Sequence, residues 1–287
     1  MNQKIKDGLT LFMILTLAWT WIMGFIPLLM GLDAENSGST LFKLLAGPAP
    51  SIVAIALILF TYTKAQKKDY FKRCFSVKQM GIKWPLLAAL FYAAVTVATT
   101  FASTTFAGGT MPEFGGIHIL AAQPYMIFLY LFLAVVSGPL NEEFGWRGFA
   151  LDKLFIRFSF WKGSAILGFI WGIWHLPWFF YPGNGQYIAW QTSPIHGIIY
   201  IVSTITLSCV VSIVYIKTNR SIMAGAFVHL VSNFLNGSVL IFPFDNTYII
   251  TLFYVRIVLE GLVILYFARN AKFRSEVENQ FYVLEQS

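Results

Sequence analysis

Long apolar runs separated by short polar segments dominate the chain. Each run has about the twenty residues that an α-helix needs to cross the hydrocarbon core of a bilayer. This pattern predicts an all-α, polytopic integral membrane bundle that forms one membrane-embedded domain over residues 1–287. About eight transmembrane helices are expected, at 8–30, 42–63, 85–106, 124–149, 163–182, 196–216, 221–242 and 248–268.

Two of these runs contain residues that interrupt helices. The second run includes Gly47, Pro48 and Pro50, which predict a kink. The fourth run is interrupted by Gly138 and Pro139. A break at membrane depth is tolerated only where protein or a water-filled cavity covers the freed backbone groups. The second break is therefore a first indication of a cavity.

Basic residues predict the orientation of the bundle. All but three of the 20 Lys and Arg residues precede the first run, follow the last run or lie in alternate connections on the same side. Under the positive-inside rule, this asymmetry predicts a multi-pass protein of the cell membrane with both termini in the cytoplasm. The first run is longer than the apolar core of a signal peptide, so we expect it to be a retained helix.

Composition supports a membrane protein and excludes several other classes. The chain is 57% hydrophobic and only 11% charged, whereas a soluble protein is about a quarter charged. The net charge is +7, and the basic residues alternate with apolar spans. This pattern predicts membrane topology and no nucleic-acid partner. Two cysteines provide neither a disulfide framework nor a zinc knuckle. The expected partners are the lipid bilayer and a membrane-anchored peptide or protein.

A few polar side chains remain inside the predicted spans, where they are costly and therefore functional candidates. They are Glu142, Glu143, Arg147, His175, His229, Asn233, Arg256 and Glu260. At about 1.5 Å of rise per residue, Glu142, His175, His229 and Asn233 lie roughly 12–18 Å from the predicted cytoplasmic ends of their helices. The sequence therefore predicts one polar site, formed by three helices, in the cytoplasmic half of the membrane.

The chemistry of this set favours hydrolysis. A carboxylate in a water-poor site can act as a general base, and His and Asn side chains can donate to a developing oxyanion. Glu143 and Arg147 are four residues apart and can form an ion pair. An alternative is a divalent metal such as zinc, held by Glu142, His175 and His229. Both routes lead to attack of water on a carbonyl group.

Three motifs on separate predicted helices resemble those of the CPBP intramembrane proteases, which include the Rce1-like type II CAAX prenyl endopeptidases and the bacterial Abi proteins. The motifs are Glu142-Glu143-Phe-Gly-Trp-Arg147, Trp171-Gly-Ile-Trp-His175 and His229-Leu-Val-Ser-Asn233. The resemblance covers roughly residues 124–242, the expected catalytic core. One departure is Trp171, because the family usually has Phe there.

The resemblance implies an intramembrane endopeptidase, with CAAX-like processing or bacteriocin self-immunity as its biological role. It implies that Glu142 activates the water with help from His175, and that His229 and Asn233 hold the oxyanion. Glu143 and Arg147 would organise the site. A glutamate mechanism is favoured over a zinc mechanism, because an Asn side chain is a poor zinc ligand and a good oxyanion donor.

Two other functions are consistent with a polar intramembrane cluster. An ion-coupled transporter also uses buried charges and broken helices, although such proteins commonly contain internal repeats, and none is evident here. A catalytically silent scaffold is a further alternative. Arg256 and Glu260, four residues apart, are expected to form a structural ion pair. Trp171, Trp174 and Trp178 are expected to serve packing and interface anchoring.

Overall fold

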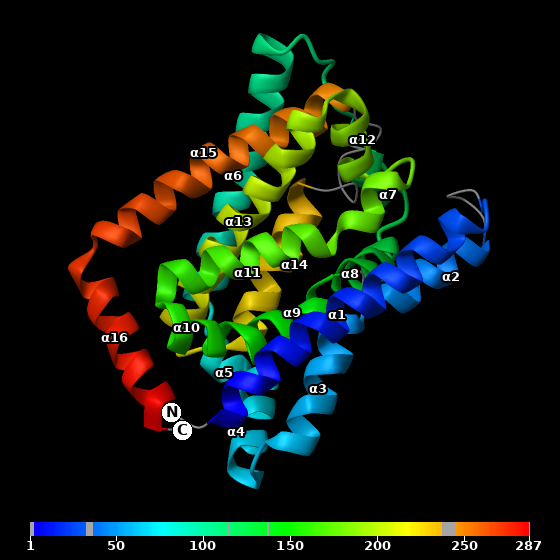
Figure 1. Cartoon of the computed structure of the whole chain (residues 1–287). Helices are drawn as coiled ribbons and strands as arrows, with labels where there is room; N and C mark the ends of the chain where they lie inside the picture. The colour runs from blue at the N-terminus through cyan, green and yellow to red at the C-terminus, as the bar shows by residue number, and fades with distance from the viewer. Residues whose placement is uncertain (1–2, 33–36, 114, 137, 237–244, 287) are drawn as a thin grey trace.

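The computed structural model describes residues 3–32, 37–113, 115–136, 138–236 and 245–286, and the regular structure in these ranges is helical. The predicted all-α class is therefore confirmed for the described part of the chain. In Figure 1, α4, α5 and the end of α16 lie at the lower end of the bundle, and α7 and α12 lie toward the upper end.

The helices follow one another closely along the chain. They are α1 (Gln3–Leu29), α2 (Ser37–Ala46), α3 (Ala49–Thr61), α4 (Lys64–Phe75), α5 (Val77–Met80), α6 (Lys83–Phe106), α7 (Gly115–Ala122), α8 (Met126–Val136), α9 (Pro139–Gly145), α10 (Asp152–Phe158), α11 (Phe160–Trp174), α12 (Gly185–Thr192), α13 (Pro194–Lys217), α14 (Ile222–Asn236), α15 (Asn246–Arg269) and α16 (Ala271–Gln286). A π-helical segment (Trp146–Leu151) joins α9 to α10, and a 3₁₀ segment (Leu176–Phe180) follows α11.

Within the described residues, four helices are long and apolar enough to cross a membrane. They are Gly8–Leu29 in α1, and α6, α13 and α15. The pair formed by α2 and α3 is a fifth candidate, bent by 41°. Gly47 and Pro48 lie at this bend, so the kink predicted there is confirmed. The chain thus has several helices of membrane-spanning length, and the count of eight stays a prediction.

Two of the three spans that carry the motifs are not continuous long helices. Expected span 124–149 is divided into α8, α9 and the π-helical segment. Expected span 163–182 is wrong as a single helix, because α11 ends at Trp174. Pro177 explains this end, since proline lacks the N–H that an α-helix interior requires. Of expected span 221–242, α14 accounts for the described part, and residues 237–242 lie outside the described residues.

Helix α13 occupies the centre of the bundle. In its most hydrophobic window 67% of the residues are buried, against 28% for the other three long helices. It packs against α11, α14 and α15. Gly168 of α11 permits the closest approach, because a Cβ atom there would lie 2.6 Å from the Cα of Ile205. A larger residue would separate the two helices.

A buried ionic cluster connects α4, α10 and the end of α13. Asp152 Oδ2 lies 3.3 Å from Arg73 Nη1 and 3.0 Å from Arg220 Nη1, and Asp152 Oδ1 accepts a 2.9 Å bond from the Tyr215 hydroxyl. Arg73 and Arg220 belong to the basic residues that predict the cytoplasmic side. In the fold they also neutralise the buried carboxylate of Asp152. Burying this carboxylate without a positive partner would be costly.

Candidate active site

Helix α9 and the π-helical segment position the first motif. Pro139 suits the first turn of α9, where its missing N–H is not needed. Ser51 of α3 donates a 2.8 Å hydrogen bond to the carbonyl of Leu140, and the Tyr70 hydroxyl donates a 2.9 Å bond to the carbonyl of Phe144. Neighbouring helices therefore hold α9 by its backbone. Single π-helical turns of this kind often occur at functional sites.

Glu143 is the centre of a buried ionic network. Its Oε1 atom lies 2.8 Å from Arg147 Nη1 and 2.9 Å from His229 Nδ1. Glu143 and Arg147 are fully buried, and His229 is 3% exposed. The predicted i, i+4 ion pair is therefore present. Because His229 Nδ1 donates to the carboxylate, the Nε2 atom is left to face the rest of the site.

Glu142 makes a different set of contacts from its neighbour. Its Oε2 atom accepts a 2.5 Å hydrogen bond from Trp171 Nε1 of α11. The same indole lies 4.8 Å from the guanidinium of Arg147 and makes an edge contact with His229 at 4.9 Å between ring centroids. Trp171 thus contacts Glu142, Arg147 and His229, which is more than the packing role expected for it.

His175 follows the last residue of α11, at the junction with the 3₁₀ segment. Its Nδ1 atom lies 2.8 Å from the carbonyl oxygen of Trp171, so Nδ1 donates the proton and Nε2 has the free lone pair. The imidazole packs edge-on against Trp174 at 4.7 Å and Tyr200 at 5.7 Å. The junction and these rings fix the direction of the histidine.

Gly138 marks the point where the polar groups converge. A Cβ atom at this glycine would lie 3.1 Å from Asn233 Nδ2, 3.3 Å from His229 Nε2 and 3.4 Å from Glu142 Oε1. Side chains from α9 and α14 therefore surround one point beside the backbone of Gly138. Glycine at this position keeps the point free of a side-chain carbon. The break predicted at Gly138 and Pro139 is thus directly beside the polar cluster.

A metal site does not fit this arrangement. Within the described residues, no group of three or more His, Cys, Asp or Glu side chains could hold a metal ion. Glu142, His175 and His229 are therefore not arranged as the zinc site that was the alternative expectation. Glu143 contacts Nδ1 of His229 and Trp171 contacts Oε2 of Glu142, so His229 Nε2 and Glu142 Oε1 are the atoms left to face the site.

Arg256 and Glu260 form a separate buried pair, as predicted. Arg256 Nε lies 3.2 Å from Glu260 Oε1, and Glu260 also accepts hydrogen bonds from Tyr92 and Thr206. This network joins α6, α13 and α15 and contains none of the motif residues. Two residues of the site itself were assigned no chemical part from sequence: Trp171 and Gly138.

Comparison with known proteins agrees with the three motifs. Residues 124–235 match the model of the family described as type II CAAX prenyl endopeptidase, Rce1-like. The chain is also 28% identical over 255 residues to CAAX prenyl protease 2 of Methanococcus maripaludis, an alignment covering 88% of this chain and 92% of the relative. The matched region contains the motifs of α9, α11 and α14, and over this region the chain is similar to the Rce1-like type II CAAX prenyl endopeptidase family.

Proposed function

We propose that this protein is an intramembrane endopeptidase that hydrolyses a peptide bond of a membrane-associated substrate. The observation that supports this proposal best is the convergence of Glu142 Oε1, His229 Nε2 and Asn233 Nδ2 on one point. All three polar atoms lie within 3.1–3.4 Å of the position that a Cβ atom at Gly138 would take, so they face the same space beside that backbone. The side chains provide a base and donors, as peptide hydrolysis requires.

Glu142 is the proposed general base. It takes a proton from a water, and the resulting hydroxide attacks the carbonyl carbon of the scissile peptide bond. His175 assists by accepting a hydrogen bond from the same water through its free Nε2 lone pair. When the carbon–nitrogen bond breaks, the proton held by Glu142 passes to the leaving amine. Trp171 orients the carboxylate through its hydrogen bond to Oε2.

His229 and Asn233 are the proposed donors to the oxyanion. Asn233 donates through Nδ2. His229 Nε2 donates only when the imidazole is protonated on both nitrogens, because Nδ1 already donates to Glu143. The carboxylate of Glu143 stabilises that imidazolium, as the buried aspartate of a serine protease does. Arg147 holds Glu143 in place through the 2.8 Å contact between Nη1 and Oε1.

The proposed substrate is a lipid-anchored peptide with a CAAX-type C-terminal sequence. The named relative is a CAAX prenyl protease, and the helices of membrane-spanning length support a site beside a bilayer. The charge pattern favours entry from the cytoplasmic side. The site residues and the direction of entry are proposals that rest on the geometry and on the sequence.

Hydrolysis by the purified full-length protein tests this function. The substrates are a farnesylated CAAX peptide, the same peptide with an acyl anchor, and the peptide without a lipid. Glu142→Gln should lower turnover by about 10²–10⁴-fold, the range for loss of a general base. Glu276→Gln is the control, because it makes the same change at a glutamate whose partly exposed ion pair with Lys217 lies outside the site. It should retain turnover.

Failure of the wild-type protein to cleave any of the three peptides would favour the scaffold alternative. Equal cleavage by Glu142→Gln and wild type would remove Glu142 from the mechanism. A chelator arm separates the chemical routes: full activity after verified metal removal supports the glutamate mechanism, and activity restored only by added zinc contradicts it.

A further inference from the structure

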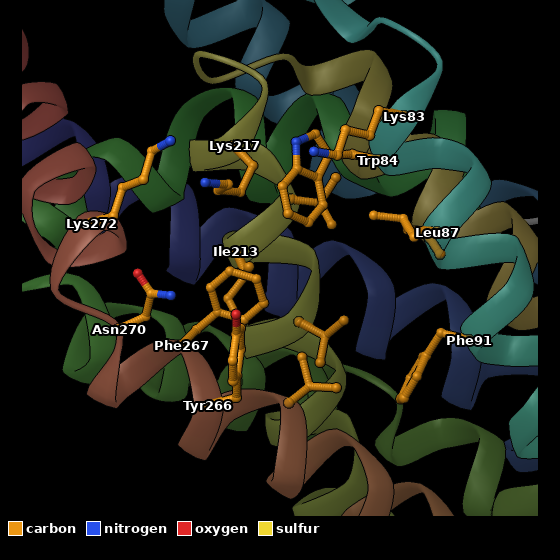
Figure 2. Close-up of a pocket in the computed structure, with 14 residues that line it drawn as sticks. Lys83, Trp84, Leu87, Phe91, Ile213, Lys217, Tyr266, Phe267, Asn270 and Lys272 are labelled. Atoms are coloured by element: carbon orange, nitrogen blue, oxygen red, sulfur yellow. The ribbon is translucent and has the colours of Figure 1, made fainter.

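A groove separate from the active site runs between α6, α13 and α15. Its volume is about 490 Å³, and its walls are mainly apolar side chains such as Phe91, Ile213 and Phe267. None of the six proposed site residues lines it. Figure 2 shows these side chains below a row of basic ones.

One end of this groove is strongly basic. Lys83 at the start of α6, Lys217 at the end of α13 and Lys272 in α16 all line it, and no Asp or Glu does. Lys217 pairs with Glu276, at 2.6 Å between Nζ and Oε2. Within the described residues, neither Lys83 nor Lys272 takes part in an ion pair, and both are exposed. Two positive charges thus lie at the mouth without a carboxylate partner among the described residues, and Lys83 Nζ lies 5.7 Å from the centroid of the Trp84 ring.

The depth of the groove matches one leaflet of a membrane. From Lys83 to Phe91 the helix advances eight residues, about 12 Å at 1.5 Å per residue. One leaflet of a bilayer has a hydrocarbon depth of about 15 Å. Trp84 lies at the basic end, with Lys217 5.2 Å from its ring centroid. Tryptophan is enriched at the membrane–water interface, where the basic end would then lie.

We propose that this groove binds an anionic phospholipid of the cytoplasmic leaflet. The phosphate lies between Lys83 and Lys272, and an acyl chain lies along Phe91, Ile213 and Phe267. The unpaired lysines select for negative charge, and the apolar walls exclude a free soluble anion as the preferred occupant. Basic pockets between transmembrane helices on the cytoplasmic side bind anionic lipid head groups for this reason. The site does not depend on the peptidase proposal.

Lipid retention by the purified full-length protein tests the site. The protein is equilibrated with detergent micelles containing equal amounts of phosphatidylglycerol and phosphatidylcholine, and bound lipid is measured by native mass spectrometry. Wild type should retain phosphatidylglycerol preferentially. The double variant Lys83→Gln/Lys272→Gln should lose at least about tenfold of that preference, since each lysine near an anionic surface contributes about 1 kcal/mol.

Two further variants make the test specific. Lys64→Gln/Lys68→Gln removes two exposed lysines of α4 on the same predicted side and should retain the preference. Leu87→Trp fills the apolar part and leaves the three lysines in place, so it should also lose phosphatidylglycerol. Thermal midpoints within a few degrees of wild type establish that all variants are folded.

Three results would overturn the proposal. The first is equal retention by the Lys83/Lys272 and Lys64/Lys68 variants, which would leave only non-specific charge attraction. The second is evidence that only the phosphate is bound: either excess inorganic phosphate displaces the lipid, or Leu87→Trp leaves lipid retention unchanged. Either result would leave an anion site without an acyl-chain site. The third is displacement by a farnesylated peptide, which would make the groove a substrate site.

Discussion

The indole of Trp171 donates a hydrogen bond to Glu142, the residue proposed as the general base, at 2.5 Å between Nε1 and Oε2. The family usually has Phe at this position, and a phenyl ring cannot make this bond. Trp171→Phe preserves an aromatic ring and removes the donor. A hydrogen bond to a charged group contributes about 1.5–3 kcal/mol, so turnover should fall by roughly 10- to 100-fold with little change in KM.

Trp174→Phe is the matched control for this prediction. Trp174 lies in the same helix, is 3% exposed against 2% for Trp171, and donates its own 2.7 Å bond to Thr20. It should cost some stability and leave turnover within about twofold of wild type, because phenylalanine keeps an aromatic ring beside His175 and the lost bond of about 1 kcal/mol to Thr20 lies outside the site. Equal losses of turnover in the two variants would show that Trp171 acts only through packing.

Glu143→Gln should destabilise the protein strongly. The substitution leaves the buried guanidinium of Arg147 without its carboxylate and removes the partner of His229. Breaking a buried pair by removing one partner costs about 3–5 kcal/mol. Glu276→Gln breaks the more exposed pair with Lys217 and should cost at most about 1 kcal/mol. Denaturant or thermal unfolding in detergent measures the stability of both variants. Similar losses of stability in the two would contradict the greater burial of the Glu143–Arg147 pair.

The sequence could predict the contacts that helix periodicity fixes. Glu143 and Arg147 pair as expected, because residues four apart share one face of a helix. The bond between Glu142 and Trp171 joins residues of two helices, and no local pattern encodes how those helices approach. Trp171 was therefore assigned to packing, although its position in a motif with His175 was a signal for a closer role.

Predictions for the fold succeeded where a break coincides with a visible residue pattern. The bend between α2 and α3 follows from Gly47 and Pro48. The end of α11 at Trp174 was missed because hydropathy remains high through Phe180, although Pro177 was a signal. A hydropathy pattern reports burial in an apolar medium and does not distinguish a continuous helix from a broken one.

Asp245 gives the fold a pH-dependent element outside the long helices. Asp245 caps α15. Burial acts to raise the pKa of its carboxyl group, but hydrogen bonds from the backbone N–H groups of Thr110 and Tyr248 outweigh burial and lower this pKa below its ordinary 3.8. A lowered folded-state pKa means that the stabilisation is present above the unfolded-state value and is lost as pH falls through the lowered value.

Asp245→Ala should therefore lower the thermal midpoint at neutral pH, and its difference from wild type should diminish below about pH 3.8. Ser193→Ala is the control, because Ser193 caps α13 with a hydroxyl that does not titrate. Its effect on the midpoint should be independent of pH. A difference for Asp245→Ala that is constant from neutral to acidic pH would contradict the role of the charged carboxylate.

Gly138 offers the sharpest test of the site, because its backbone closes the space in which the polar groups meet. Gly138→Ala adds one methyl group at 3.1–3.4 Å from Asn233 Nδ2, His229 Nε2 and Glu142 Oε1. These distances leave no room for both the methyl group and a water, so turnover should fall by at least about 10²-fold, as for a misplaced reacting group. Gly138 has φ −152° and ψ −71°, so the thermal midpoint of Gly138→Ala is measured beside its turnover to establish that the variant is folded. Gly261→Ala in α15 is the control, since its Cβ would meet nothing within 4 Å, and it should retain full activity. Normal hydrolysis by a correctly folded Gly138→Ala would place the reacting water elsewhere.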